Sequence, residues 1–180
     1  MDKPEIIESR EIYRGRIFEL SVATVKENET VYTREIIMHP GSAVIVPLFA
    51  DQTIALVRQY RHPAGDFLLE LPAGSLSPGE DPETGARREL EEEIGVTAGK
   101  IEKLTEFYVS PGFLGEKMHV FLATELTEVG QKLEADEILS IEKFPLSAVP
   151  DMILNNKLED AKTMIGLTLT AARYGINLLR

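Results

Sequence analysis

Residues 74–96, GSLSPGEDPETGARRELEEEIGV, carry the clearest structural signal in the chain, a loop that leads into one helix. Asp81 has a side chain suited to an N-cap, and Pro82 suits the first helical position because its fixed backbone angle is already helical. Glu83 favours the positive end of the helix dipole, and Gly95 stands where a helix commonly ends. These signals agree on a helix that begins at Pro82 and ends just before Gly95.

One face of this helix is predicted to be acidic. Glu89, Glu92 and Glu93 stand at positions i, i+3 and i+4, so their side chains share one face. Glu91 falls on the opposite side, and Gly85 lies on the acidic face, where it lets a neighbouring loop approach closely. The adjoining apolar stripe consists of Ala86, Leu90 and Ile94. The helix therefore combines an apolar stripe with a cluster of carboxylates.

The clustered carboxylates need a compensating charge. Neighbouring like charges destabilise a helix by a few tenths of a kcal/mol per pair, and bound cations can reverse that sign. The chain has no cysteine and only three scattered histidines, His39, His62 and His119, so a metal site must be rich in oxygen ligands. Such ligands suit Mg²⁺ or Mn²⁺. For the helix alone, a solvated acidic face is the commoner interpretation.

The composition is that of a globular protein. At 180 residues, with 43% apolar and 27% charged residues, the chain can bury one sizeable core, and we predict a single domain over residues 1–180. The first residues lack the apolar stretch of a signal peptide, and no run reaches the ~20 apolar residues of a membrane span, which favours a cytoplasmic protein without a membrane partner. The net charge of −11 repels polyanions, so nucleic acid is a poor partner.

Most of the sequence before residue 72 is predicted to form strands. They are expected at REIYRG, RIFELSVATV, VYTREIIMH, SAVIVPLF, TIALVRQY and FLLEL. Later strands are expected at KIEKLTEFYVS, MHVFLATEL and ILSIEKF, with helices near residues 148–156 and 161–179. Strands with helices packed on them indicate an α+β sandwich. The apolar residues 41–49 predict a central strand covered on both faces, whereas residues 8–36 alternate as in an outer sheet or a subunit interface.

Residues 74–96 also resemble the Nudix box, which reads Gly, five residues, Glu, seven residues, then Arg-Glu-apolar-any-Glu-Glu-any-Gly-apolar. The matching positions are Gly74, Glu80, Arg88, Glu89, Leu90, Glu92, Glu93, Gly95 and Val96, with no departure. In the Nudix family this box forms a loop, a helix and a loop on a mixed sheet, within an α/β/α sandwich. The resemblance outweighs the solvated-face interpretation and implies a hydrolase that cleaves nucleoside diphosphate derivatives with divalent metal ions.

The resemblance assigns a role to each polar position of the box. Arg88 is expected to hold a glutamate by a charge-assisted hydrogen bond, and Glu80 to support the site from the preceding loop. Arg88 and Glu93 are expected to take part in catalysis. The expected ligands of Mg²⁺, or alternatively Mn²⁺, are the backbone carbonyl of Ala73 and the carboxylates of Glu80, Glu89, Glu92, Glu93 and Glu116.

The box identifies the reaction but not the substrate, so other positions must indicate it. Pro111 lies sixteen residues beyond Gly95, within SPGF, and a proline there resembles the subgroup that hydrolyses ADP-ribose. The segments HPGSAVIV, VRQYRHP, LELPAG, VSPGF and DAKT also resemble bacterial ADP-ribose pyrophosphatases, from about Tyr13 almost to the end of the chain. The implied reaction is attack of an activated water on one phosphorus of ADP-ribose, which gives AMP and ribose 5-phosphate.

Several residues match substrate-binding positions of this subgroup. Arg58 and Arg61 are expected to meet the phosphates or Glu70, since guanidinium forks suit oxyanions, although one of them can be structural. Glu70 is expected to orient a ribose or an arginine. The loop that contains Pro111 is expected to contact the terminal ribose. The expected substrate-binding residues of this part are Arg58, Arg61, Glu70, Ser110, Pro111 and Gly112.

A general base is expected on the late acidic loop LEADEILS. This loop contains Glu134, Asp136 and Glu137, and we favour Glu137 because it matches the subgroup best and lies nearest the following strand. Glu116 resembles a further site carboxylate near the metals, so Glu116 and Glu134 are the alternative bases. Exposed loop acids without a catalytic role remain the other interpretation.

Homodimers of the subgroup exchange their N-terminal strands. Residues 1–40 are therefore expected to form an antiparallel β extension that is exchanged between subunits. The residues that match the partner's adenine pocket are Arg16, Ile17 and Glu35. Any amphipathic strand shows the same alternation, so the dimer is a firmer expectation than these contacts.

Two rival functions stay open at this point. One is a pyrophosphatase for another nucleoside diphosphate sugar, because the box does not discriminate among such substrates. The other is a Nudix-like sensor that binds ADP-ribose without cleaving it. Sensors of this kind usually have an eroded box and an attached DNA-binding segment, whereas the box of this chain is complete.

Overall fold

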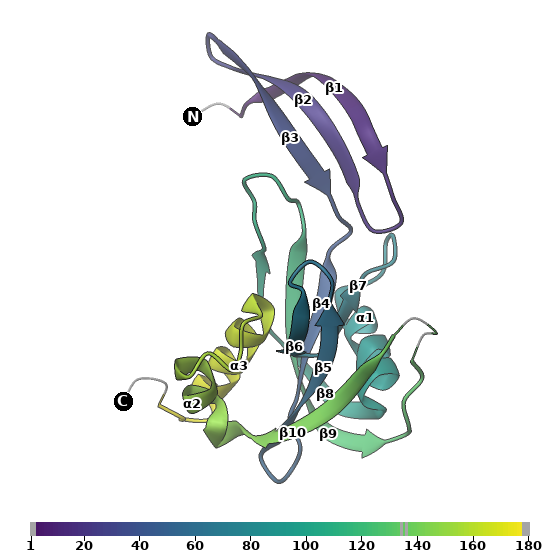
Figure 1. Ribbon diagram of the computed structural model, residues 1–180, viewed down its shortest axis with the longest axis vertical. Coiled ribbons are helices and arrows are strands. Elements are labelled where there is room, and N and C mark those ends of the chain that lie inside the picture. The colour runs from purple at the N-terminus through teal and green to yellow at the C-terminus, as the bar shows by residue number, and fades with distance from the viewer. Residues whose placement is uncertain (1–2, 134, 136, 178–180) are drawn as a thin grey trace. The chain divides into compact units, whose positions relative to one another are not determined.

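The computed structural model describes residues 3–133, 135 and 137–177, and the chain divides into two compact units (Figure 1). The smaller unit contains the residues up to Gly41 together with Phe107–Met118. The larger unit contains Ser42–Glu106 and the residues from His119 onward. In the part of the chain that the structure covers, no helix is long and apolar enough to cross a membrane.

The smaller unit is built on a three-stranded antiparallel sheet. Its strands are β1 (Glu5–Arg14), β2 (Glu19–Glu27) and β3 (Thr30–Met38), in the order β1-β2-β3. The loop that contains Pro111 attaches to β3 at Ile37, whose N–H donates to the Phe113 carbonyl over 2.7 Å and whose carbonyl accepts from Gly115 over 2.8 Å. The sequence-distant segments of this unit are therefore joined by backbone hydrogen bonds.

The larger unit contains two sheets. The four-stranded sheet has the order β7 (Ala73–Ser75), β4 (Ser42–Pro47), β9 (Lys117–Glu128) and β8 (Val96–Tyr108). The three-stranded sheet has the order β10 (Leu139–Pro145), β5 (Thr53–Arg61) and β6 (Asp66–Glu70), and its pairs are antiparallel. Every residue of β4 is buried, which confirms the prediction of a central strand from its apolar sequence.

Helices cover both faces of β4. Helix α1 (Pro82–Glu89) contacts β4 and β7, and α3 (Ala161–Arg173) contacts β4; α2 (Val149–Leu154) follows a single 3-10 turn, η2 (Leu146–Ala148), and contacts α3 (Figure 1). Ala43 faces Gly85 of α1, whereas Val46 faces Gly166 of α3. Residues of opposite parity in a strand point to opposite faces, so the two helices lie on different sides of the sheet. The predicted α+β sandwich is confirmed.

The predicted apolar stripe of the acidic helix lies in the main core. Ala86 and Leu90 are fully buried and Ile94 nearly so. The cluster that surrounds them consists of Ala43, Ile45, Ala55, Val57, Leu76, Val96, Phe121 and Ala123. Burial of this stripe stabilises the packing of the helix against the sheet, since each large apolar side chain contributes about 2 kcal/mol when it is removed from water.

The acidic helix begins as predicted and changes its winding halfway. The Asp81 side chain accepts from the Thr84 N–H at 3.0 Å, which confirms the N-cap, and Gly95 ends the helix with a left-handed φ of 74°. Between these ends, α1 is followed by a π-helical turn, η1 (Leu90–Ile94), in place of a continuous α-helix. A π turn closes by i→i+5 hydrogen bonds and is often found at functional sites.

The last helix is shorter than predicted. The sequence pattern placed its end at Leu179, which lies outside the described residues, whereas α3 ends at Arg173. Gly175 then adopts a left-handed φ of 73° that an α-helix cannot continue through.

Candidate functional site

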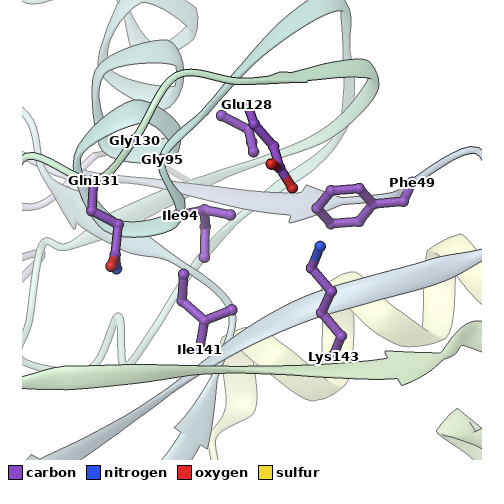
Figure 2. A pocket seen from close by; sticks show the side chains of 9 residues that line it. Phe49, Ile94, Gly95, Glu128, Gly130, Gln131, Ile141 and Lys143 are labelled. Carbon is purple, nitrogen blue, oxygen red and sulfur yellow. The ribbon is translucent and has the colours of Figure 1, made fainter.

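A hollow of about 460 Å³ opens in the larger unit beside the end of η1 (Figure 2). In it, the Lys143 ammonium lies 3.9 Å from the centre of the Phe49 ring. Its other lining residues are Ile94, Gly95, Val96, Glu128, Gly130, Gln131 and Ile141. None of the expected metal ligands or substrate-binding residues lines this hollow, so the candidate site is built from the acidic face of the helix instead.

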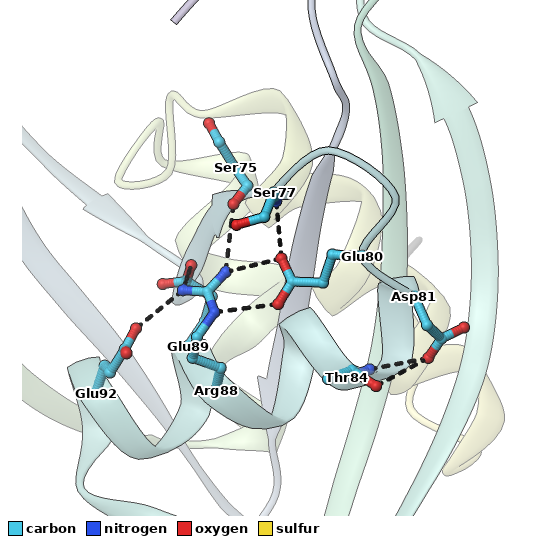
Figure 3. Close-up of polar contacts among 8 residues, drawn as sticks. All are labelled: Ser75, Ser77, Glu80, Asp81, Thr84, Arg88, Glu89 and Glu92. Carbon is cyan, nitrogen blue, oxygen red and sulfur yellow. Dashed lines mark hydrogen bonds and ion pairs between the residues drawn. The ribbon is translucent and has the colours of Figure 1, made fainter. Parts of the chain in front are cut away.

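Arg88 connects three of the box glutamates (Figure 3). Its Nε and Nη2 each donate to Glu80 over 3.2 Å, while its Nη1 donates to Glu89 over 2.6 Å and to Glu92 over 3.0 Å. The Arg88 hydrogen bonds, followed by one from the Ser77 N–H, lower the pKa of Glu80. Arg88 thus makes the charge-assisted hydrogen bonds to glutamates that its expected role requires.

Glu93 lies deeper than these side chains and is only 4% exposed. Its Oε2 accepts from the Ala73 N–H over 3.1 Å, which joins the helix to β7. Burial, together with the charges of Glu89 and Glu137, raises the pKa of Glu93 to about 8, although Arg61 acts in the opposite direction. Burial also raises the pKa of Glu89, which is 5% exposed. The two carboxylates are therefore held close together in a place that disfavours their charge.

Two glycines let the loop before the helix lie against the acidic face. A Cβ on Gly74 would fall 1.9 Å from Glu89 Oε1, so the carboxylate lies directly over the main chain of β7. A Cβ on Gly85 would fall 2.5 Å from the Leu76 side chain. The close loop approach predicted at Gly85 is confirmed, and Gly74 is required for a cradle that holds the Glu89 carboxylate.

The donor set fits a divalent cation. In this structure the Arg88 guanidinium lies between Glu89 and Glu92, and within residues 3–133, 135 and 137–177 no three acidic or histidine side chains already converge as a metal-binding group. The carboxylates nevertheless outnumber the arginine, they are partly or fully buried, and all their donor atoms are oxygen. Rotation of Arg88 toward Glu80 alone would free Glu89 and Glu92 for a hard cation such as Mg²⁺.

The structure brings Arg61 and Glu70 together and separates Arg58 from them. Glu70 is 2% exposed, and Arg61 binds it with a fork of two hydrogen bonds of 2.7 and 2.9 Å. Burial by itself raises the pKa of Glu70, but the adjacent cations Arg61 and Lys162 outweigh it, so the net effect is a lowered pKa. Arg58 instead pairs with Glu142 of β10 at 2.5 Å.

The expected residues of the N-terminal strands and of the Pro111 loop lie in the smaller unit. Arg16 and Ile17 form the exposed turn between β1 and β2, and Glu35 is exposed on β3 opposite Val22. The Ser110 carbonyl accepts from Phe113 and Leu114, which closes a turn through Pro111 and Gly112. The Oε1 atom of Glu116 lies 3.7 Å from Nδ1 of His39. The adenine and ribose positions expected from the sequence thus belong to the same unit.

The late acidic loop is described only in part. Glu134 and Asp136 lie outside the described residues. Glu137 is half-buried, and its charge contributes to the raised pKa of both Glu89 and Glu93. The charge of Glu137 therefore acts on both members of the carboxylate pair.

Sequence reasoning did not assign a role to Lys162. This lysine is 8% exposed and forms an ion pair with Glu70. The signal available in the sequence was the segment DAKT, in which Asp160 and Thr163 have the spacing of an N-cap and its partner. That spacing predicts the start of a helix, but it does not show that Lys162 turns inward.

Comparison with known proteins identifies close relatives. Residues 38–165 match the family model of the NUDIX domain. The chain is 39% identical over 160 residues to an ADP-ribose pyrophosphatase of Bacillus subtilis, with 87% of this chain and 86% of that protein covered. It is 35% identical to a methanol dehydrogenase activator of Bacillus methanolicus, with 89% of each covered. A crystal structure of an ADP compounds hydrolase superposes with a TM-score of 0.85 at 23% identity, covering 99% of this chain and 98% of that chain.

Proposed function

The chain belongs to the Nudix family, and we propose that it hydrolyses the diphosphate of ADP-ribose to AMP and ribose 5-phosphate. The observation that carries this proposal is the buried pair Glu89 and Glu93, set over the main chain of Gly74 and Ala73 at the start of a complete box. The Bacillus subtilis relative named ADP-ribose pyrophosphatase supports the choice of substrate.

Nudix hydrolases need divalent metal ions, and we propose Mg²⁺, with Mn²⁺ as a substitute. A bound divalent cation supplies Lewis acidity toward phosphoryl oxygens and lowers the pKa of a bound water. The residues that would hold it are Glu89, Glu92 and Glu93, with Glu80 and the Ala73 carbonyl as further oxygen ligands. Glu116, which belongs to the smaller unit, stays a prediction from the sequence. The oxygen-only chemistry of these ligands and the burial of Glu89 and Glu93 support this assignment.

Three further charged residues are proposed to bind the substrate or to accept a proton. We propose that Glu137 accepts the proton of the attacking water, because its charge acts on both Glu89 and Glu93. Arg61 binds the diphosphate by the part of its guanidinium that Glu70 does not use. Arg58 is a second candidate for the phosphates, at the cost of its pair with Glu142.

The smaller unit is proposed to bind the adenosine and the terminal ribose, and to form a homodimer. Arg16, Ile17 and Glu35 would complete the adenine pocket of a partner subunit, while Ser110, Pro111 and Gly112 would contact the terminal ribose. Exposed apolar residues of the three strands and their turns support an interface with a second copy; they are Ile6, Ile7, Ile12, Tyr13, Ile17, Phe18, Val31 and Met38. A cytoplasmic location stays a prediction from the sequence.

A substrate panel tests the proposed function. The purified protein is incubated with Mg²⁺ and ADP-ribose, ADP-glucose, GDP-mannose, NADH or FAD, and the products are separated and identified. ADP-ribose is expected among the best substrates, with AMP and ribose 5-phosphate as products. Preference for another sugar nucleotide would favour the first rival function. Tight binding of ADP-ribose without any turnover would favour the sensor.

A further inference from the structure

The start of α3 contains a buried group of charges whose purpose the proposed reaction does not explain. The Lys162 ammonium contacts the Glu70 carboxylate and lies 3.0 Å from Asp160 Oδ2. Asp160 also caps the helix, because its Oδ2 accepts from the Thr163 N–H at 3.0 Å. A buried ammonium is costly unless carboxylates pair with it, so its place here is set by Glu70 and Asp160 together.

The start of α3 also anchors residues 70–73, which lead into β7. The Leu71 N–H donates to Thr163 Oγ1 over 2.7 Å, although 92 positions separate the two residues. Two residues later, the Ala73 N–H donates to Glu93. Residues 70–73 are therefore held between α3 on one side and the acidic helix on the other.

Arg61 connects this anchor to the site. Its Nε and Nη2 are committed to Glu70, and its Nη1 makes no hydrogen bond to any residue that the structure describes. The side chain is 39% exposed, and its charge acts on Glu93. The guanidinium thus has its fork fixed by Glu70 and keeps further N–H donors for a ligand.

We propose that Lys162 is a positioning residue that aims Arg61 at the diphosphate of the substrate. The Lys162 ammonium fixes the Glu70 carboxylate, Glu70 fixes the fork of Arg61, and the remaining Arg61 donors bind the phosphate oxygens. This inference rests on the proposed function, since it gives Arg61 a diphosphate to bind. It makes the start of α3 a part of the substrate site.

The first test is Lys162→Met, which keeps an unbranched side chain and removes the charge. The KM for ADP-ribose is expected to rise about tenfold, in the range found for residues that orient a ligand-binding group, while kcat changes little. The dissociation constant of imidodiphosphate, a diphosphate analogue that does not hydrolyse readily, is expected to rise by a similar factor in calorimetry with Mg²⁺. Unchanged values of both constants would overturn the proposal.

A double-mutant cycle separates positioning from general destabilisation. Arg61→Lys loses the planar fork and is expected to raise KM on its own. If Lys162 acts through Arg61, then Lys162→Met adds little in the Arg61→Lys background. Multiplication of the two effects on KM would show that Lys162 acts independently of Arg61 and would contradict the proposal.

Two control variants exclude simpler explanations. Lys157→Met makes the same substitution at an exposed lysine before α3, and its KM is expected to match that of the unsubstituted protein. Leu167→Ala opens a cavity under α3 and is expected to lower Tm without changing KM, since Leu167 is a fully buried apolar residue. An equal rise of KM in Leu167→Ala would reduce Lys162 to a structural role.

A balanced variant covers the case in which Lys162→Met does not fold. Glu70→Gln combined with Lys162→Met removes one buried carboxylate and one buried ammonium together, so neither of these two charges is left buried without the other. Arg61 and Asp160 each lose a partner, but both side chains are partly exposed to water. It is expected to fold and to bind imidodiphosphate more weakly, because Arg61 has lost its carboxylate. Unweakened binding in this folded variant would overturn the proposal.

The two readouts also separate this inference from the proposed function. If binding of imidodiphosphate by Arg61 depends on Lys162 but the protein does not hydrolyse ADP-ribose, the proposed function fails and the positioning role stands. If it hydrolyses ADP-ribose and Lys162→Met changes neither constant, the positioning role fails alone. If Arg61→Lys also changes nothing, Arg61 does not bind the diphosphate, and the inference is wrong.

Discussion

Glu93 is almost completely buried, and the negative charges of two other carboxylates, Glu89 and Glu137, act on it. Removal from water and like charges both favour its protonated form, and the single N–H of Ala73 only partly offsets them. A bound divalent cation would reverse this balance, because it supplies the positive charge that the pair lacks. At the scale of single residues, the two buried carboxylates are thus unfavourable when both are charged.

Replacement of Glu93 by Gln is expected to lower kcat/KM for ADP-ribose by at least about 100-fold, since loss of a proposed ligand should exceed the loss of a residue that only orients one. Steady-state kinetics with Mg²⁺ measure the effect, and circular dichroism verifies folding. Glu91→Gln is the matched control two residues earlier in the chain, because Glu91 forms an exposed ion pair with Lys132. Normal activity in Glu93→Gln would contradict the metal assignment.

The raised pKa of Glu93 also predicts a pH dependence of stability without metal. A carboxyl group that titrates at about 8 when folded, and near its ordinary value when unfolded, binds its proton more tightly in the folded state. Its contribution is fully present at acidic pH and is lost as pH rises toward about 8. In EDTA, Tm is therefore expected to fall more between pH 5 and pH 8 for the unsubstituted protein than for Glu93→Gln. Equal slopes in scanning calorimetry would show that Glu93 is ionised throughout.

The elements of the larger unit are joined by close contacts between helices and β4. A Cβ on Gly166 of α3 would fall 2.6 Å from the Leu71 side chain and 3.2 Å from Val46. The helix therefore approaches the sheet as closely as its backbone permits, and Leu71 is the residue that follows Glu70. Leu71 is thus held by α3 twice, through its side chain at Gly166 and through its N–H at Thr163.

Replacement of Gly166 by Ala is expected to destabilise the protein by about 1–3 kcal/mol, because the added methyl group overpacks a contact that lacks room for it. The free energy of unfolding in urea measures the effect. Leu169→Ala, on an exposed position of the same helix, is the control and should change stability by no more than about 0.5 kcal/mol. An unchanged free energy of unfolding in Gly166→Ala would mean that α3 can move away from the sheet without destabilising the protein.

At the scale of the whole molecule, the smaller unit has a sheet with more exposed apolar side chains than a solvated surface needs. Every residue of β1 is exposed, including Ile6, Ile7 and Ile12. Exposed apolar surface of this kind usually marks an interface. The residues proposed for adenine and ribose also lie in this unit, so assembly and substrate binding are expected to depend on each other.

Replacement of Ile7 and Ile12 by Lys is expected to convert a dimer of about 40 kDa into the 20.0 kDa monomer and to raise the KM for ADP-ribose. Size-exclusion chromatography with light scattering measures the mass. Leu154→Lys adds a charge at an exposed apolar position of α2 and should leave the mass unchanged. A monomer before any substitution would contradict the proposed exchange of N-terminal strands.

Several features of fold and site followed from short-range patterns. Asp81, Pro82 and Gly95 predicted the ends of the acidic helix, because capping depends on residues within one turn. The apolar run of β4 predicted its burial on both faces for a similar reason. The box residues predicted the oxygen-rich chemistry of the site, since their spacing along one helix places the carboxylates together.

Other features depend on residues that only the folded chain brings into contact. The π turn at Leu90–Ile94 has no signal in the local pattern. The Glu89 carboxylate lies 1.9 Å from the place that a Cβ on Gly74 would take, and this contact depends on how β7 and α1 pack together. The pairing of Lys162 with Glu70 spans 92 positions. Helix caps and strand burial are local, and the sequence expresses them directly; burial of a charge beside a distant partner depends on the packing of α3 against β4, so it emerges only when the chain is folded.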